Sequence, residues 1–393
     1  AIYGARAATG VIVVTTKKGI KDKMTLSLNV RMGISLPSFG GLKYMNSQEL
    51  LQYGEMSLSN WWDNNTALQG KYTNKQQFIQ DTLGVLKDNF DLTRTTDWRG
   101  LSFRAGPTKD MALNIRGGGD KTQYYFSYNY FNEKGTKIGY DLTRHLFKAR
   151  MDFDVTKFLS LGVNLNGAFE KNISPNSGDV QSYHPWLSPT NEEGSLKYNI
   201  PWWSQFVMNS DPKVNPLLDN RYNDITELKS NLFGSFSGTL KLFPWMTITS
   251  TNTLTLLNQN VNDYTDSRTY SGNNKSNNNS NGTLRIGDSR NWSFLTSNLL
   301  RLQHTFGKHA LSGLVGQEWY ERHSRSSEIR MYDQNLAGER NVGGFAKQGT
   351  KGDAGSKPTG DETESGSFSV FSEVNYNYNG RYMASASFRT DGS

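Results

Sequence analysis

Long stretches of this chain alternate polar and apolar residues with a period of two, and no other feature constrains the fold as strongly. In residues 24–35, Leu26 and Leu28 alternate with Ser27 and Asn29. Successive side chains of a β-strand point to opposite faces, so the pattern predicts strands with one apolar and one polar face. Eleven stretches carry it, at 24–35, 110–119, 122–136, 143–155, 158–170, 229–242, 246–260, 291–306, 309–325, 366–379 and 381–390.

The predicted strands are long for a soluble protein, in which a strand usually has about 5–6 residues. Alternating strands of about 10 residues or more are typical of a transmembrane β-barrel. No apolar run approaches the roughly 20 residues that a membrane helix needs. Aromatic residues make up 12% of the chain, which is typical of an ordered protein. The sequence therefore predicts an all-β fold, a transmembrane antiparallel β-barrel.

The connections between these strands are alternately short and long. Turn-forming residues make the short ones, at 119–121, 156–157, 243–245, 307–308 and 379–380. The long ones lie at 36–109, 171–228, 261–290 and 326–365, and a brief connection at 137–142 is the exception. Outer-membrane barrels have short turns on the periplasmic side and long loops outside. The alternation predicts that strand 24–35 runs outward and that strand 110–119 returns.

The first long connection is expected to contain helices. Asn46 is followed by Glu49 three positions on, and this spacing predicts a capped helix over 46–58. A second helix is expected over 74–83.

Motifs of enzyme chemistry are weak or absent in the sequence. Residues 117–122 read Gly-Gly-Gly-Asp-Lys-Thr, but a strand pattern follows them, so we interpret them as a turn and not as a phosphate loop. The chain has no cysteine, and its 5 histidines do not have metal-ligand spacing. Glu192 and Glu193 lie in a polar loop, where solvation is the simpler interpretation. We expect no catalytic, metal-binding or cofactor-binding residue, and no enzyme activity.

The net charge of +7 comes from basic residues that are scattered along the chain. Nucleic-acid binding usually requires a continuous basic face, so no nucleic-acid partner is expected.

Tryptophans in the long connections are the candidate ligand contacts. An indole face can stack on a sugar ring or on an apolar group of a ligand. Packing of the loops, or a place in the aromatic girdle of a barrel, is the alternative interpretation. The candidates for contact with a substrate or a lid are Trp61, Trp62, Trp186, Trp202 and Trp203.

Three segments of the chain resemble segments of one transporter family, and they occur in the same order as in that family. Residues 2–19 begin Ile-Tyr-Gly-Ala-Arg-Ala-Ala-Thr-Gly, 111–170 contain Gly-Gly-x-Asp-Lys-Thr-x-Tyr-Tyr, and 366–393 contain Phe-Arg-x-Asp-Gly-Ser. These segments resemble SusC/RagA-type TonB-linked outer-membrane proteins, the TonB-dependent transporters of Bacteroidota. The signature residues of the first segment are Ile2, Tyr3, Gly4, Arg6, Ala7, Ala8 and Gly10.

The resemblance implies a domain division and a fold. Residues 1–20 would be the C-terminal end of a plug domain, and 21–393 the N-terminal part of the barrel with its extracellular loops. The family barrel has about 22 strands around a plug, so eleven strands would be about half of it. We expect this chain to be an internal piece of a longer protein, without the TonB box, most of the plug and the later strands. Expressed alone, it is expected to aggregate.

The resemblance also implies a function in the outer membrane, in contact with lipid. The family imports large nutrients, mostly oligosaccharides and in some members peptides. Its partners are a SusD-like lipoprotein, which serves as a lid, and the TonB–ExbB–ExbD complex, reached through the N-terminal region. No cofactor is implied. The alternatives are a passive porin or adhesin barrel, against which the plug segment argues, and a secreted β protein that binds or cleaves glycans, against which the long strands argue.

Overall fold

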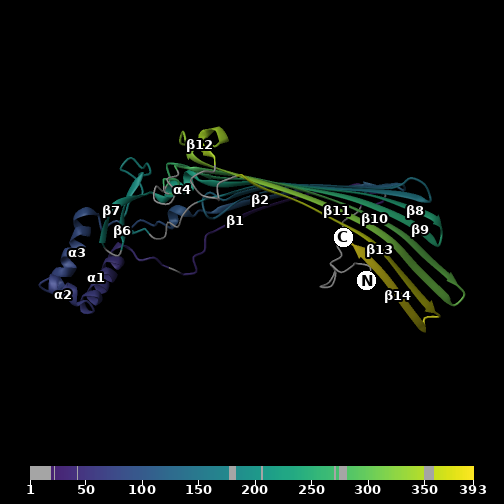
Figure 1. The fold of residues 1–393 in the computed structure, drawn as a ribbon, viewed down its shortest axis with the longest axis horizontal. Coiled ribbons are helices and arrows are strands. Elements are labelled where there is room, and N and C mark those ends of the chain that lie inside the picture. Colours follow the sequence, from purple (N-terminus) through teal and green to yellow (C-terminus); the bar gives the residue numbers. More distant parts are fainter. Residues whose placement is uncertain are drawn as a thin grey trace.

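A curved antiparallel sheet with loop structure gathered at one end makes up the chain in the computed structural model (Figure 1). The structure describes residues 19–21, 23–41, 43–176, 183–204, 207–269, 271–273, 281–348 and 358–393. The family signature between Ile2 and Gly10 lies outside these residues, as does all of the predicted plug segment except Gly19 and Ile20.

The main sheet has 12 strands, and eleven of them follow one another in space in the order of the sequence. Every neighbouring pair is antiparallel, as β1 and β2 show, so the chain runs up and down across the sheet. The strands of this path are β1 (Thr25–Ser35), β2 (Gly106–Gly118), β3 (Thr122–Lys134), β4 (Asp141–Asp154), β5 (Leu159–Ser174), β8 (Asp224–Phe243), β9 (Met246–Thr265), β10 (Thr283–Phe306), β11 (His309–Gln334), β13 (Thr359–Tyr378) and β14 (Tyr382–Gly392).

All eleven predicted strands are present, and most extend further than predicted at the end that faces the long loops. β10 begins at Thr283 and β11 continues to Gln334. These extensions carry polar residues on both faces, such as Arg285 and Asp288 in β10, so the alternation that predicted the strands disappears there. Backbone pairing with the next strand continues without it, as in the pair of Arg285 with Arg330.

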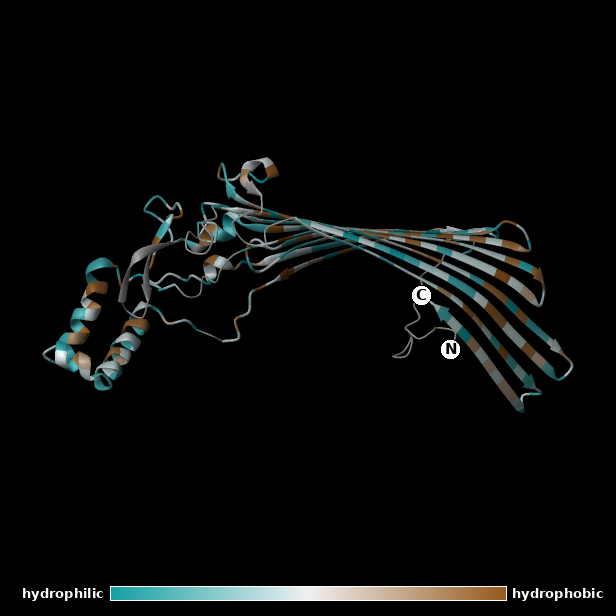
Figure 2. Cartoon of the chain, in the orientation of Figure 1, coloured by the Kyte–Doolittle hydropathy of each residue, from teal (hydrophilic) through white to brown (hydrophobic). Residues whose placement is uncertain are grey.

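The register places the apolar positions of neighbouring strands on one face. Leu28 lies opposite Leu113 on β2, whereas Asn164 lies opposite Ser235 on the other face of the β5–β8 pair. Figure 2 shows the resulting alternation of hydrophobic and hydrophilic residues along the strands. The sheet therefore has one apolar surface and one polar surface.

The predicted short turns all lie at the end of the sheet away from the helices (Figure 1). The β13–β14 turn uses the left-handed backbone region at Asn379 (φ 50°) and Gly380 (φ 70°). Asparagine and glycine adopt this region more readily than other residues, which explains why they occur there.

The first long connection forms three α-helices, α1 (Ser47–Asp63), α2 (Thr66–Lys71) and α3 (Lys75–Asn89), and a 3-10 turn, η2 (Gly100–Ser102). The two predicted helices are confirmed as α1 and α3, and α2 was not predicted. A core of buried side chains joins this unit to the connection between β5 and β8. Its members are Leu58, Phe78, Leu83, Leu86, Trp98, Trp186, Leu187, Ile200 and Leu217.

The other loops hold small elements that the sequence did not predict. They are the hairpin β6 (Asn199–Ser204) and β7 (Val207–Val214), helix α4 (Pro216–Tyr222), the 3-10 turn η3 (Val342–Gly344) and β12 (Phe345–Gln348), which pairs with β11. In the described part of the chain, no helix is long and apolar enough to span a bilayer.

Candidate binding site in the outer loops

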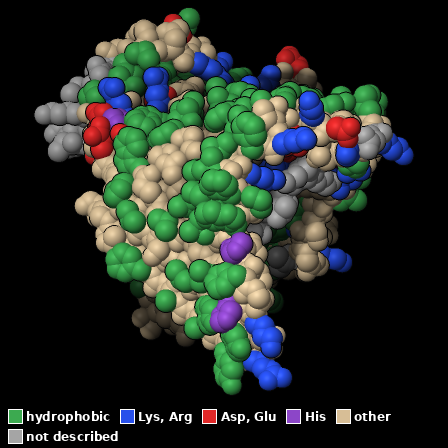
Figure 3. Space-filling model, turned by 90° about the vertical axis from the view of Figure 1, so that its right-hand side faces the viewer, with side chains coloured by type: hydrophobic (Ala, Val, Ile, Leu, Met, Phe, Trp, Pro, Cys, Tyr) green, Lys and Arg blue, Asp and Glu red, His purple; other side chains and the backbone are tan. Residues whose placement is uncertain are grey.

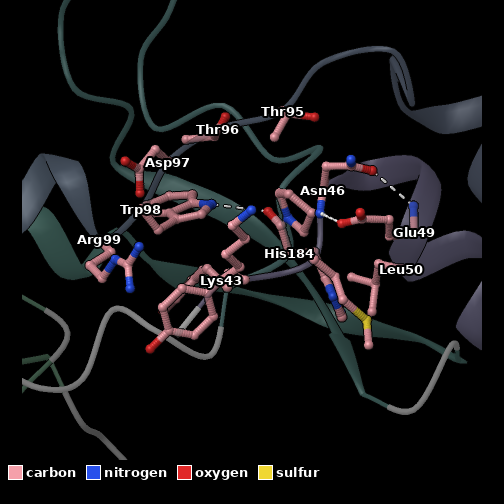
Figure 4. Close-up of a pocket in the computed structure, with 14 residues that line it drawn as sticks. Lys43, Asn46, Glu49, Leu50, Thr95, Thr96, Asp97, Trp98, Arg99 and His184 are labelled. Carbon is pink, nitrogen blue, oxygen red and sulfur yellow. Dashed lines mark hydrogen bonds between the residues drawn. The ribbon is translucent and has the colours of Figure 1, made fainter. Parts of the chain in front are cut away.

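A cavity of about 620 Å³ opens between the first long connection and the connection that follows β5 (Figure 4). Its lining combines aromatic rings, charges of both signs and hydroxyl groups. The lining residues are Lys43, Tyr44, Met45, Asn46, Glu49, Leu50, Thr95, Thr96, Asp97, Trp98, Arg99, Tyr183, His184 and Pro185.

The N-terminus of α1 forms one side of the cavity and is held by a capping box. The Asn46 side chain accepts a hydrogen bond from the Glu49 backbone N–H at 2.9 Å, and the Glu49 carboxylate accepts one from the Asn46 N–H at 2.9 Å. Each bond satisfies a backbone donor that the helix cannot satisfy itself. The Ser47 hydroxyl donates to the carbonyl oxygen of Arg94, which fixes the helix to the far side of the same loop.

An indole wall closes the opposite side of the cavity. Trp98 is 4% exposed, and its Nε1 donates to the His184 carbonyl oxygen at 3.0 Å. The Tyr183 ring lies 5.0 Å from the Trp98 ring, at 35° to it. A backbone hydrogen bond of 2.7 Å from the Thr96 N–H to the Pro185 carbonyl joins the two loops beside this wall. The wall is therefore held by contacts between the two loops.

Arg99 supplies a positive charge that is held by two aromatic rings. Its guanidinium carbon lies 4.0 Å from the centre of the Phe39 ring and 4.8 Å from that of Tyr44. Such stacking orients the guanidinium against the two ring faces. Tyr44 remains 50% exposed and presents an aromatic ring at the cavity. Lys43 and Glu49 add one charge of each sign to the lining.

The cavity is suited to noncovalent binding of a polar ligand. Exposed aromatic surface can stack on a ring or an apolar group, and the charged and hydroxyl groups can form hydrogen bonds. Across the described ranges, no cluster of three or more His, Cys, Asp or Glu side chains could hold a metal ion.

A second network, centred on Asp266, holds the other outer loops in place. Asp266 is fully buried and accepts hydrogen bonds from the Arg268 Nε and from the Tyr264 hydroxyl, both at 2.8 Å. Its backbone N–H donates to the Asn223 side chain at 2.8 Å, and the Gln334 side chain donates to the Tyr264 hydroxyl at 2.6 Å. Burial alone would raise the pKa of Asp266, but the hydrogen bonds outweigh burial and hold that pKa below the usual 3.8.

The candidate tryptophans lie in different surroundings. Trp61 is 46% exposed on α1, and Trp62 next to it packs against the core of the loops. Trp186 is 2% exposed, so its indole is part of that core in this structure. Trp202 and Trp203 lie on β6, opposite Asn209 and Met208 of β7. Whether any of the five contacts a substrate or a lid stays a prediction.

The cavity brings together residues that the sequence analysis did not single out. Trp98, Tyr44 and Tyr183 lie far apart in loops of mixed composition, and a single loop aromatic is more often a packing residue. The signal for Trp98 was that it follows the largely polar segment 91–97 and has no alternating pattern around it.

Comparison with known proteins agrees with the resemblance seen in the sequence motifs. No protein-family model matches the chain. Two curated proteins of Formosa agariphila, TonB-dependent receptor P39 and TonB-dependent receptor P3, are each 25% identical to it over its whole length. The chain spans about a third of the length of these relatives, 35% and 36% respectively.

The fold matches the corresponding part of a solved transporter. The RagAB peptide transporter structure superimposes with a TM-score of 0.74 at 22% identity, over 99% of this chain and 44% of the other. The RagAB peptide importer in the closed-closed state gives a TM-score of 0.76 at 20% identity. The prediction of an all-β barrel wall is confirmed by these matches and by the strand content. The chain is thus similar in sequence to TonB-dependent receptors and similar in fold to the RagAB transporter, which agrees with its resemblance to the SusC/RagA-type TonB-linked outer-membrane proteins.

Proposed function

We propose that this chain is part of a TonB-dependent importer that carries a large nutrient, most simply an oligosaccharide, across the outer membrane. Residues 21–393 would form a part of the barrel wall together with its outer loops, and residues 1–20 the end of the plug. The observation that carries the proposal is the aromatic and charged cavity in the outer loops, above a sheet with one apolar and one polar face.

The apolar face of the sheet has the dimensions of a bilayer-facing surface. Trp292 and Trp319 lie on this face toward the loops, and Phe306 and His309 lie on it near the short turns. Trp319 and His309 are ten positions apart on β11, or about 34 Å at roughly 3.4 Å per residue. A strand tilt of about 40° reduces this to about 26 Å, close to the apolar band of about 25 Å in outer-membrane barrels.

The polar face suits the lining of a transport channel. Asn164, Ser235 and Thr253 face the same side on neighbouring strands, and the Thr253 hydroxyl donates to the Ser235 hydroxyl at 3.2 Å. Hydroxyl and amide groups of this kind bind a passing polar substrate by short-lived hydrogen bonds. No covalent chemistry is required, so we propose a transporter without enzyme activity.

The partners follow from the proposed transport cycle. A SusD-like surface lipoprotein would cover the outer loops, and the TonB–ExbB–ExbD complex would act through the N-terminal region of the whole protein. Trp61 on α1 is 46% exposed, which supports our proposal that it contacts such a lid. Peptide is the second candidate cargo, because the matched structures are named as peptide transporters and the cavity holds charges of both signs.

Uptake by the full-length parent protein tests the proposal. Cells that carry only this transporter should lose growth on the cargo oligosaccharide when the parent gene is deleted. Tyr44→Ala combined with Arg99→Ala should weaken cargo binding to the purified complex by at least tenfold, whereas Lys87→Ala on the exposed side of α3 should not. If the complex bound peptides and no oligosaccharide, the cargo would be identified as peptide. Free ion conductance in a bilayer, without substrate binding, would support a passive pore in its place.

A further inference from the structure

The short turns at one end of the sheet carry basic residues without acidic partners. Lys157 lies in the β4–β5 turn, Lys308 in the β10–β11 turn and Arg381 in the β13–β14 turn, and all three are exposed. No ion pair within the described ranges involves any of them. By contrast, Asp120 in the β2–β3 turn is neutralised by Lys21 at 2.6 Å. Asp154, at the end of β4 three positions before Lys157, offsets one of these charges, and the rim remains net positive.

The rim is continuous across neighbouring turns. The Asn379 N–H, beside Arg381, donates to the Lys308 carbonyl oxygen at 2.8 Å, so the β10–β11 and β13–β14 turns touch. No acidic residue lies within four positions of Lys308 or of Arg381 in the sequence. Hairpins two strands apart are about 10 Å apart in a sheet, so their tips can engage separate headgroups.

Aromatic side chains form a band directly above this rim. The Phe306 ring stacks on His309 at 5.7 Å, and the Phe243 ring stacks on Trp245 at 5.2 Å. Tyr378 and Tyr382 extend the band to the β13–β14 hairpin, with ring centres 6.4 Å apart. Figure 3 looks onto this end and shows hydrophobic side chains, histidines and Lys or Arg side chains close together along the lower edge of the view.

Aromatic rings with a polar edge are enriched at the level of lipid headgroups, and bases beside them meet the phosphates. We propose that Lys157, Lys308 and Arg381, together with this aromatic band, bind the headgroups of anionic phospholipids in the periplasmic leaflet of the outer membrane. The assignment rests on the proposed function for its orientation, since short turns face the periplasm in outer-membrane barrels. A phospholipid is favoured over a soluble phosphate because the bases lie next to exposed apolar rings.

Lipid titration of the purified full-length protein by native mass spectrometry tests the site. The probes are phosphatidylglycerol and phosphatidylcholine of the same chain length. The variant is Lys157→Gln, Lys308→Gln and Arg381→Gln combined. Each base near an anionic surface is worth about a fivefold change in affinity, so the triple variant should bind phosphatidylglycerol roughly 100-fold more weakly. Its affinity for phosphatidylcholine should not change.

The matched control removes the same charge from the outer loops, as Lys71→Gln, Lys87→Gln and Lys137→Gln combined. This control should bind phosphatidylglycerol as the unchanged protein does. Equal binding of the two lipids by the unchanged protein, or an equal loss in both variants, would overturn the proposal. Competition by glycerol 3-phosphate as strong as that by the lipid would also overturn it, in favour of a free-phosphate site. Uptake is not the readout, so a failed import assay with retained lipid preference would reject the proposed function alone.

Discussion

Asp266 and Arg268 form a two-point contact in the β9–β10 loop, in which the guanidinium Nε and one terminal nitrogen each donate to the carboxylate at 2.8 Å. The carboxylate also accepts from Tyr264 and is fully buried, so it connects the end of β9 to the loop that follows. We predict that Asp266→Asn removes the charge but not the volume and lowers the local stability of this loop. The expected cost is about 1–3 kcal/mol, toward the lower end because Arg268 is 41% exposed.

Hydrogen–deuterium exchange of residues 264–269 in the full-length protein measures this effect. The control is Asp288→Asn, whose partner Arg290 is largely exposed, and for which we expect a change of about 0–1 kcal/mol. Equal protection of the loop in the Asp266 variant and in the unchanged protein would contradict the prediction.

The same carboxylate gives the loop a defined response to acid. Its pKa is held below 3.8 in the folded protein, so the unfolded chain binds a proton at a higher pH than the folded one does. The stabilisation is therefore complete at neutral pH and is lost as the pH falls below about 3.8. We predict that the difference in Tm between the unchanged protein and Asp266→Asn is constant above about pH 5 and shrinks below pH 3.8. A difference that grows in acid would reverse the sign and reject the assignment.

Gly316 on β11 is needed because the Phe371 ring lies over it. A Cβ built at Gly316 would lie 2.3 Å from Phe371 Cζ and 2.8 Å from Leu299 Cδ2. Phe371 is itself buried, and the Arg389 guanidinium lies 5.0 Å from its centre, so the ring has little room to move. We predict that Gly316→Ala destabilises the full-length barrel by about 1–3 kcal/mol.

Gly313, three positions earlier on the same strand, provides the control. A Cβ there would meet nothing closer than 3.8 Å, so Gly313→Ala should be neutral or slightly stabilising. Denaturant unfolding of the two variants, followed by tryptophan fluorescence, distinguishes them. Equal stability would mean that Phe371 turns aside at no cost.

Alternation was sufficient to predict the strands, because a sheet with one apolar and one polar face imposes a period of two. Alternation gave no signal where both faces of a strand are polar. This explains why the ends of β10 and β11 that face the long loops were not predicted. The helix α1 was predictable from Asn46 and Glu49, since a capping box is a local signal. The cavity was not predictable from the sequence, because Tyr44, Trp98 and Tyr183 meet only through tertiary packing of two loops. A short hairpin such as β6–β7, within the connection between β5 and β8, has no periodicity long enough to detect.

The edges of the sheet lead to a prediction about the isolated polypeptide. β1 and β14 each pair with one neighbour only in the described part of the chain, so both offer unpaired backbone groups. Leu28 and Met32 on β1 are 66% and 71% exposed, which adds an apolar surface beside one open edge. Exposed apolar edges promote pairing between molecules, so we predict that residues 1–393 produced alone aggregate in detergent-free buffer.

Charges on the edge should reduce this association. Leu28→Lys combined with Met32→Lys places two like charges on the exposed face of β1 and should lower light scattering several-fold at equal concentration. The control is Ser27→Lys alone. It adds one charge to the opposite face, which already carries Arg31, and should have the smaller effect. A soluble monomer with a cooperative thermal transition, formed by the unsubstituted polypeptide, would contradict the barrel-wall interpretation, because an open sheet with an exposed lipid-facing surface is not stable in water.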